Sequence, residues 1–344
     1  MSQSLRLWFN QAYRGTFQLI GMLHQGLAAD GVELHVTGSH TARSTPFLQA
    51  CDDVFVEPEH VVGEEWVELA LRICAERRID VFVPGRERAA IDDAADRFAD
   101  AGVALMVNPA DAVRTLGDKA AAHASALSLG VPVPLTHVVT DADGFRAAVA
   151  ALRAEGLRAC MKPAVDHGAK GFRVLDESVG GYEDLLALPD ARVHPDEVAR
   201  RIDAVGEVAP LLVCELLDGD ELSVDVLSHD GDVLAAVPRS KAGPQWTRQL
   251  VDDLEALSIT EAISKGHGLR YLSNVQVRYG QGRARLLEVN TRAASGLFHS
   301  AASGLNLPHL ALRLLLDGEV HVPAPRLGAT VLTWTEGREV TLPF

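Results

Sequence analysis

The segment YLSNVQVRYGQGRARLLEVNTRAASGLFHSAAS, residues 271–303, contains two short runs in which apolar and polar residues alternate. Because glycines separate the runs, we expect a β-hairpin with strands at 274–279 and 285–290 and a turn at 280–282. Side chains two positions apart share one face of a strand, so Glu288 and Asn290 point the same way. Pairing of the strands can bring Gln276 to that face.

These three side chains offer only oxygen ligands. A glutamine, a glutamate and an asparagine suit Mg²⁺ shared with substrate phosphates rather than zinc or copper. The sequence therefore indicates a magnesium site on the hairpin. Taken alone, the same letters also fit an ordinary half-buried strand whose polar face meets water.

The composition is that of a soluble globular protein. The chain has 344 residues, of which 47% are apolar and 23% charged, enough for two or three cores. The four cysteines lie in apolar runs without ligand spacing, so we expect buried thiols in a reducing cytoplasm.

The net charge of −15 argues against a general nucleic-acid or anionic-membrane role, although a local basic pocket can still bind a nucleotide. No apolar run has the length of a membrane span, and the N-terminus lacks the features of a signal peptide. We expect a cytoplasmic protein without membrane contact.

Residues 1–112 alternate strand and helix patterns, which predicts a parallel sheet of Rossmann type. No GxGxxG follows the first strand, so this domain is a poor candidate for dinucleotide binding. Ligands of such sheets lie at the carboxyl ends of the strands. The candidates there, each of which loop capping or turn formation also explains, are Asn10, Arg14, Ser39, Gly85 and Arg86.

The next part of the chain carries two lysines in positions suited to phosphate. Asp118 is a candidate N-cap of an alanine-rich helix, which places Lys119 in the first turn, where an anion is preferred. Lys162 lies on the strand RACMKP, and a loop with Gly168 and Gly171 follows. Such a loop can close over phosphates because glycine lets backbone amides approach.

The run LLVCELLDGDELSVDV suits an adenine slot, in which the backbone of Glu215, Leu216 and Leu217 reads the base edge and Glu221 reaches the ribose. An ordinary β-meander explains these letters equally well. We further expect a helix over 249–267, a leucine-rich helix after residue 292 and a closing pair of strands in the tail. The acidic region 179–209 has only scattered helical character.

Read in order, the DK pair at 118–119, MKP with its glycine loop, CELLDGDELSVDV, and NVQVR followed by LEVNTR resemble the ATP-grasp superfamily. Among its branches the chain is most similar to the carbamoyl-phosphate-synthase-like proteins. Within these it resembles the ATP-grasp proteins encoded with tellurium-resistance (Ter) operons, on the motifs LWFN, FVPGRE, GFRVLD and VPRSK.

The resemblance implies a mixed α/β and α+β chain: a Rossmann-like pre-ATP-grasp domain at 1–112 and a two-lobed ATP-grasp fold. Its small lobe would span 113–213 with the phosphate flap, and its large lobe 214–344 with the metal and adenine sites. It also implies an ATP- and Mg²⁺-dependent ligase that phosphorylates a small carboxylate and passes the acyl group to an amine or similar nucleophile. A homodimer would be compatible with this reading.

The resemblance also implies roles for individual residues. Lys119 and Lys162 match the nucleotide-phosphate lysines, and Arg292 matches the arginine beside the transferred phosphoryl group, with Arg239 expected to assist it. The remaining matches are the flap at Gly168–Gly171, the adenine hinge at Glu215, Leu216 and Leu217, the ribose contact Glu221, and the magnesium ligands Gln276, Glu288 and Asn290.

Two departures from the family pattern stand out. The flap reads HGAKG rather than a run of glycines, which makes Lys170 an additional phosphate candidate, and Gln276 replaces the more common acidic ligand, as in the carbamoyl-phosphate branch. The acid pocket is expected near Arg14, Arg86, Arg239, Lys241 and Ser295. Two alternatives remain open at this point: a non-catalytic ATP-binding sensor or scaffold, and a phosphotransferase that stops at the phosphorylated product.

Overall fold

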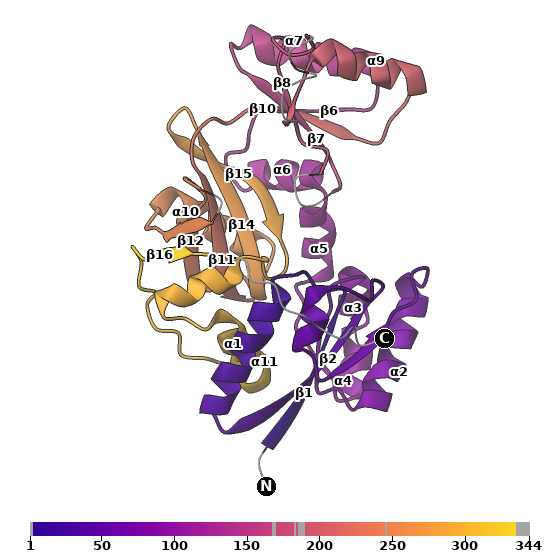
Figure 1. Cartoon of the computed structure of the whole chain (residues 1–344), viewed down its shortest axis with the longest axis vertical. Coiled ribbons are helices and arrows are strands. Elements are labelled where there is room, and N and C mark those ends of the chain that lie inside the picture. The colour runs from indigo at the N-terminus through magenta and orange to yellow at the C-terminus, as the bar shows by residue number, and fades with distance from the viewer. Residues whose placement is uncertain (1–2, 167–169, 182–183, 185–189, 245, 335–344) are drawn as a thin grey trace. The chain divides into compact units, whose positions relative to one another are not determined.

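The computed structural model describes the whole chain except residues 1–2, 167–169, 182–183, 185–189, 245 and 335–344 (Figure 1). Within the described residues, no helix combines the length and the apolar character that a membrane span requires. The strands form three sheets, each described below with the helices that pack on it.

The first sheet is parallel and has the strand order β3-β2-β1-β4-β5. Its strands are β1 (Gln3–Asn10), β2 (Val32–His40), β3 (Asp53–Val56), β4 (Val81–Val83) and β5 (Ala104–Leu105). The helical connections are α1 (Thr16–Ala29), η1 (Pro46–Ala50), α2 (Gly63–Arg77), α3 (Arg88–Asp93) and α4 (Ala95–Asp100). The expected Rossmann-like arrangement is therefore confirmed.

Strand β1 shows why this sheet is buried on both faces. Leu7 and Phe9 pack in one apolar cluster with α1, whereas Trp8 between them packs in another cluster with Trp66 of α2 and stacks on Phe82 at 4.0 Å. Successive side chains of a strand point to opposite faces, so a continuous apolar run fills two cores.

Residues 88–100 form two short helices, α3 and α4, rather than one continuous helix. They meet at Ala94, whose backbone angles (φ −98°, ψ 16°) leave the helical range. Sequence periodicity does not reveal such a break, because Ile91 and Phe98 on either side are both buried and keep the apolar pattern continuous.

The second sheet has the order β6-β10-β7-β8-β9 and is mostly antiparallel. Its strands are β6 (Thr136–Val139), β7 (Ala159–Pro163), β8 (Arg173–Leu175), β9 (Arg192–Val193) and β10 (Leu211–Glu215). Two helices, α7 (Ala142–Ala154) and α9 (Pro195–Val205), supply the core with Phe145, Leu152 and Ile202. Helices α5 (Ala110–Gly117) and α6 (Lys119–Ser128) lead into this part of the chain.

The third sheet has the order β15-β14-β11-β12-β13-β16. Its strands are β11 (Glu221–His229), β12 (Asp232–Ser240), β13 (Thr247–Leu250), β14 (Tyr271–Gly280), β15 (Arg283–Asn290) and β16 (Thr330–Leu332). The accompanying helices are α10 (Leu254–Gly266), η2 (Leu297–Ser303) and α11 (Leu307–Asp317).

Strands β14 and β15 are the expected hairpin, with longer strands and a shorter turn. Only Gln281 and Gly282 form the turn, both with positive φ (52° and 74°), as two-residue hairpin turns require. The expected helix over 249–267 begins at Leu254, because Thr247–Leu250 pairs as a strand with β12 and β16. Of the expected closing strand pair, β16 is present, and the rest of the tail lies outside the described residues.

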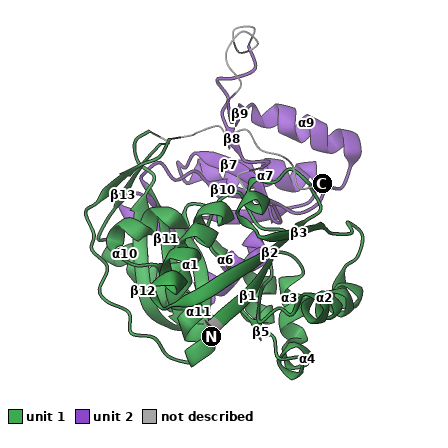
Figure 2. Ribbon diagram, turned by 60° about the horizontal axis from the view of Figure 1, so that its bottom comes forward, with its two compact units in different colours: residues 1–116, 221–276, 289–344 green, residues 117–220, 277–288 purple. Residues whose placement is uncertain are grey.

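Packing divides the chain into two compact units (Figure 2). Unit 1 comprises residues 1–116, 221–276 and 289–344, and unit 2 comprises residues 117–220 and 277–288. The division expected from the sequence, at 112 and 213, therefore differs from the compact units in two respects. The first domain belongs to the same unit as most of the third sheet, and the tip of the β14–β15 hairpin belongs to unit 2.

Side-chain contacts within unit 1 account for the first of these differences. The Asn108 amide donates to the carbonyl of Leu272 (3.1 Å), and Arg270 donates to the carbonyl of Val107 (3.0 Å). In unit 2, the Gly219 amide donates to the carbonyl of Tyr279 (2.9 Å), which ties the hairpin tip to the segment after β10.

Candidate functional site

The first candidate residue, Lys119, opens helix α6 in unit 2. The Asp118 side chain accepts hydrogen bonds from the amides of Ala120 (2.8 Å) and Ala121 (3.1 Å), which confirms it as the N-cap. The Lys119 ammonium donates to the carbonyl of Asp166, in the loop that follows β7. Burial lowers the pKa of Lys119, Glu288 raises it, and the neighbouring charge of Lys162 lowers it further.

Lys162 projects from β7 of the same unit. Its ammonium donates to the carbonyl of Leu287 (3.3 Å), and among the described residues it forms no ion pair with a carboxylate. The His123 Nε2 also lies 3.2 Å from the Leu287 carbonyl. Burial and then the charge of Lys162 lower the pKa of His123 to about 4, so this imidazole is neutral at pH 7.

Lys119 and Lys162 form a cationic site inside unit 2. Lys119 has Glu288 nearby, whereas Lys162 has no carboxylate partner among the described residues. Like charges held together are unfavourable unless an anion offsets them. The polyanionic phosphates of a nucleotide would supply such an offset.

The glycine loop after β7 is only partly described, and Gly168 lies outside the described residues. Gly171 has a φ of 73°, and a Cβ there would lie 2.7 Å from the Pro163 ring, so glycine is required at this turn. The Lys170 side chain is exposed and lies 3.6 Å from the Asp166 carboxylate.

The expected adenine hinge follows strand β10. The buried Glu215 carboxylate is ion-paired with Arg285 and accepts from the amide of Leu135 (3.3 Å), so this side chain serves the fold. Among the described residues, the backbone carbonyl of Glu215 accepts only a weak hydrogen bond from the Cys160 thiol (3.8 Å). The backbone amide of Leu217 donates to no other described residue. The backbone of the hinge therefore retains a donor and an acceptor.

An apolar cluster lies beside the hinge in unit 2. It consists of Cys160, Ala164, Leu212 and Cys214, with Ala120, Phe172 and Leu216 packed against it. An apolar surface next to unsatisfied backbone groups is the usual environment of a base or another flat ligand.

The three metal candidates lie on neighbouring strands, Gln276 on β14 and Glu288 and Asn290 on β15. The Gln276 Oε1 accepts from the Lys241 ammonium (3.0 Å), which also pairs with Glu221. Among the described residues, no three His, Cys, Asp or Glu side chains cluster as a softer or all-acidic metal site would require. The amide and carboxylate oxygens of the hairpin fit a hard cation such as Mg²⁺.

Several solved structures share the fold of this chain. The chain superposes on the ADP complex of N5-carboxyaminoimidazole synthetase from Staphylococcus aureus with a TM-score of 0.68 at 13% identity, covering 95% of this chain and 81% of that one. It matches the biotin carboxylase domain of 2-oxoglutarate carboxylase from Hydrogenobacter thermophilus with a TM-score of 0.65 at 14% identity, over 94% and 73% of the two chains. The L-amino acid ligase of Bacillus licheniformis gives 0.61 at 17% identity, over 92% and 75%.

Residues 207–337 match the family described as ATP-grasp in the biosynthetic pathway with Ter operon. The chain therefore shares its fold with ATP-grasp enzymes and matches an ATP-grasp family over this segment. The carbamoyl phosphate synthase large chain of Gemmatimonas aurantiaca is 27% identical over 259 residues, which cover 71% of this chain and 22% of that protein. The corresponding chain of Mycobacterium tuberculosis is 26% identical over 237 residues, covering 66% and 20%.

The chain spans about a fifth of the length of these curated relatives. The resemblance to ATP-grasp proteins, and among them to the carbamoyl-phosphate-synthase-like proteins, that was expected from the sequence is confirmed.

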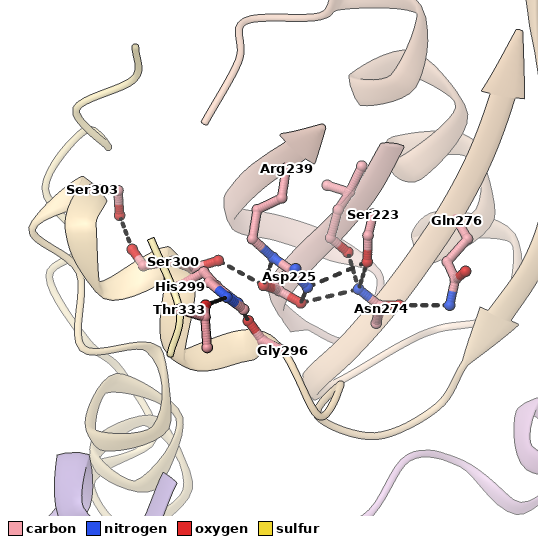
Figure 3. Close-up of polar contacts among 11 residues, drawn as sticks. Ser223, Asp225, Arg239, Asn274, Gln276, Gly296, His299, Ser300, Ser303 and Thr333 are labelled. Carbon is pink, nitrogen blue, oxygen red and sulfur yellow. Dashed lines mark hydrogen bonds and ion pairs between the residues drawn. The ribbon is translucent and has the colours of Figure 1, made fainter. Parts of the chain in front are cut away.

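Arg239 lies in a buried polar network (Figure 3). Its guanidinium donates to Asp225 through Nε (2.6 Å) and Nη2 (3.0 Å), and only 3% of its side-chain surface is exposed. Asp225 also accepts from Ser300 (2.6 Å) and from Asn274 (3.0 Å), so strands β11, β12 and β14 and helix η2 meet at one carboxylate. Sequence analysis expected Arg239 beside the phosphoryl group, whereas its charge is already balanced by Asp225.

The same network reaches the hairpin. The Gln276 side-chain nitrogen donates to Asn274 Oδ1 (3.4 Å), and Asn274 is itself fixed by Ser223 (2.9 Å) and Asp225. Asp225 is thus linked to the candidate metal ligand Gln276 through Asn274. The sequence singled out neither Asp225 nor Asn274, although both are polar residues within strand-like runs that a sheet would bury.

Arg292 follows strand β15. Its guanidinium lies 4.0 Å from the centroid of the Tyr13 ring and donates to the carbonyl of Ala293 (3.0 Å). Arg88, which the sequence analysis did not nominate, donates to the carbonyl (2.7 Å) and hydroxyl (2.8 Å) of Thr291, the residue before Arg292.

The other candidates of the first domain have mainly structural contacts. Arg86 pairs with the buried Glu57 (3.4 Å) and stacks on Trp66 (4.4 Å). Ser39 donates to Glu57 (2.6 Å), and Asn10 Oδ1 accepts from the Gly85 amide (2.7 Å). Arg14 and Ser295 are exposed.

Proposed function

We propose that this chain is an ATP- and Mg²⁺-dependent ligase that activates a carboxylate as an acyl phosphate and transfers the acyl group to an amine or a similar nucleophile. The observation that carries the proposal is the cationic site of unit 2, where Lys119 and Lys162 influence each other and Lys162 lacks a carboxylate partner among the described residues. A phosphate chain is the ligand that offsets such a site best. The fold and the similarity to carbamoyl phosphate synthase large chains support the same reading.

Lys119 and Lys162 bind the phosphates in this proposal, and the Gly168–Gly171 loop with Lys170 covers them. The backbone at Glu215 and Leu217 reads the adenine edge, Leu216 packs beside it, and Glu221 contacts the ribose. Gln276, Glu288 and Asn290 hold the metal ion. When bound, Mg²⁺ neutralises charge on the phosphates of ATP.

One carboxylate oxygen of the acid forms a bond to the γ-phosphorus while the bond from that phosphorus to the β,γ-bridging oxygen breaks, and ADP leaves with the electron pair. The acid is already ionised at pH 7, so this step requires no protein base. Lys162 and Arg292 stabilise the charge on the transferring group. The nucleophile then forms a bond to the acyl carbon while the bond from that carbon to the phosphate oxygen breaks. Phosphate leaves with the electron pair, and an amine nucleophile releases its proton to solvent.

Arg239 enters this proposal as a positioning residue rather than as a catalytic one. Its guanidinium is paired with Asp225, and the network fixes Asn274 and through it Gln276. Arg239 therefore acts on the metal ligand through Asp225 and Asn274.

Hydroxylamine traps acyl phosphates as hydroxamates, so the reaction can be tested before the natural nucleophile is known. Purified protein with MgATP, hydroxylamine and a panel of organic and amino acids should release ADP and form hydroxamate with at least one acid. ADP release with a phosphorylated product but no hydroxamate would establish a phosphotransferase. Nucleotide binding without ADP release for any acid would establish a sensor, and either result would refute the ligase.

Substitution of Arg292 by alanine should lower turnover by about 10² or more while ATP affinity stays within a few-fold, because its charge acts in the transition state. Arg97→Ala, which removes an exposed arginine paired with Glu64 and Glu68, is the matched control and should leave turnover unchanged. Normal turnover of Arg292→Ala would refute this role.

A further inference from the structure

Unit 1 contains a small cavity of about 50 Å³ at the open end of the β14–β15 hairpin, where β14 begins and β15 ends. Its apolar wall comes from Leu7 and Phe9 of β1, from Leu19 and Leu23 of α1, and from Met106. At the other side the lining is polar and includes Arg88, Thr291 and Arg292. Within the described residues, no aspartate or glutamate lines it.

The two arginines at this cavity have no carboxylate partner among the described residues, whereas several other arginines of unit 1 do. Arg77, Arg86, Arg239 and Arg270 each pair with a carboxylate. Arg88 donates only to Thr291, Arg292 donates to a carbonyl and stacks on Tyr13, and neither forms an ion pair with any described residue.

The charges at this cavity are unbalanced, because two cations lie near each other without an anion. Burial, followed by the nearby charge of Arg292, lowers the pKa of Arg88 to about 10, so the fold holds two cations near each other at a cost. A partly buried cation without an anion is unfavourable, and a guanidinium matches the two oxygens of a carboxylate in a fork geometry. A carboxylate ligand would therefore relieve the repulsion.

The lining also limits the rest of the ligand. An apolar cavity of about 150 Å³ accepts benzene, so one a third as large suits an apolar group of about two or three carbon atoms. An α-ammonium group would meet two arginines and no acidic side chain of the lining, which disfavours amino acids.

We infer that this cavity binds the acid substrate: Arg88 and Arg292 hold its carboxylate and the apolar wall holds a short aliphatic group that lacks an α-amino group. The inference rests on the proposed ligase function and names its substrate class. Arg88 thus becomes a binding residue supplied by the first domain.

The test compares butyrate with 2-aminobutyrate, which has the same carbon skeleton, and with octanoate, using hydroxamate formation as the rate readout. Butyrate should be the best substrate of the three by at least about tenfold in kcat/KM. Arg88→Gln should raise the KM for butyrate at least about tenfold, with the KM for ATP unchanged, and Arg88→Lys should restore part of the affinity. Arg97→Gln is the matched arginine control.

A second variant fills the cavity without replacing either arginine. Ala293→Leu adds three carbon atoms to the lining and should shift the preference from butyrate towards acetate by about tenfold. Ala28→Leu, at an exposed position of α1, is the control and should leave the preference unchanged. Thermal unfolding checks that each variant is folded.

Direct titration of butyrate into nucleotide-bound protein separates the two proposals. Butyrate binding that is lost in Arg88→Gln, without ADP release in the wild type, would refute the ligase and retain the carboxylate site. Turnover that favours 2-aminobutyrate, or that is indifferent to both Arg88→Gln and Ala293→Leu, would overturn the cavity inference and leave the ligase standing.

Discussion

At the scale of single residues, the surroundings of a side chain change its chemistry. His123 is an ordinary residue in the sequence, but in unit 2 it is 4% exposed and lies near Lys162 and Lys119. Both burial and the neighbouring charges disfavour its protonated form, which accounts for the lowered pKa. Its neutral ring fixes the Leu287 carbonyl that Lys162 also contacts.

This environment predicts a pH dependence of stability. The folded pKa of about 4 lies below 6.5, the ordinary pKa of a histidine, so the unfolded chain binds the proton first as the pH falls. The stabilisation is complete above about pH 6.5 and is lost towards pH 4. Between pH 7 and pH 5 the wild type should lose about 2 kcal/mol of unfolding free energy that His123→Gln does not lose.

Urea unfolding of the wild type and of His123→Gln at pH 7 and pH 5 measures the two losses of unfolding free energy. Groups that titrate alike in both proteins cancel in the comparison. Parallel pH profiles for the wild type and His123→Gln would show that this histidine is not held neutral by its surroundings.

At the scale of elements, close backbone approaches hold unit 1 together. A Cβ at Gly15, just before α1, would lie 2.1 Å from the carbonyl oxygen of Ser295, in the loop after β15. Gly15→Ala should therefore cost about 1–3 kcal/mol, because backbone must move. Gly21→Ala, within α1 and with no atom within 4 Å of its added Cβ, should instead stabilise by about 0.5–1 kcal/mol. Chemical denaturation measures the change in unfolding free energy for each substitution. Equal changes for Gly15→Ala and Gly21→Ala would contradict this prediction.

The Arg239–Asp225 pair joins three strands and η2. Asp225→Asn leaves a buried guanidinium without its counter-charge and should cost about 3–5 kcal/mol. Asp143→Asn removes a partner from the exposed pair with Arg146 and should change stability by less than about 1 kcal/mol. If the Arg239→Met/Asp225→Asn double variant is as destabilised as the sum of the single variants, the two side chains do not act as a pair.

At the scale of the whole molecule, the chain has two compact units with separate apolar clusters, and the proposed phosphate lysines both lie in unit 2. MgATP should therefore protect unit 2 against hydrogen exchange and stabilise the protein by about 2.7 kcal/mol at one hundred times its dissociation constant. Lys162→Met should abolish most of this gain, whereas Lys265→Met, at an exposed position of α10, should retain it.

Glu288→Gln adds a test of the metal. MgATP should raise the unfolding temperature more than ATP with a chelator does. Glu288→Gln should make this difference smaller, because a charged oxygen ligand is lost. An unchanged Mg²⁺ dependence of the unfolding temperature would remove Glu288 from the proposed metal ligands.

Much of the architecture follows from local patterns. Alternating strand and helix patterns predicted the parallel sheet, the glycine-flanked alternation around Gln281 predicted the hairpin, and Asp118 before an alanine-rich run predicted a helix start. These features depend on residues close together in the chain, so the sequence by itself determines them. The break at Ala94 was not predicted because the apolar pattern is continuous across it. The strand before α10 was not predicted because one of its two partner strands, β16, is distant in the sequence.

Other features depend on residues that are remote in sequence. Arg88 meets Thr291 across 203 positions, Asp225 collects donors from β12, β14 and η2, and Leu287 brings His123 and Lys162 together. Whether an arginine is paired with a carboxylate or left for a ligand cannot be read from its neighbours in the chain. Only the tertiary structure decides this, because burial and charge balance are set by side chains that folding brings into contact.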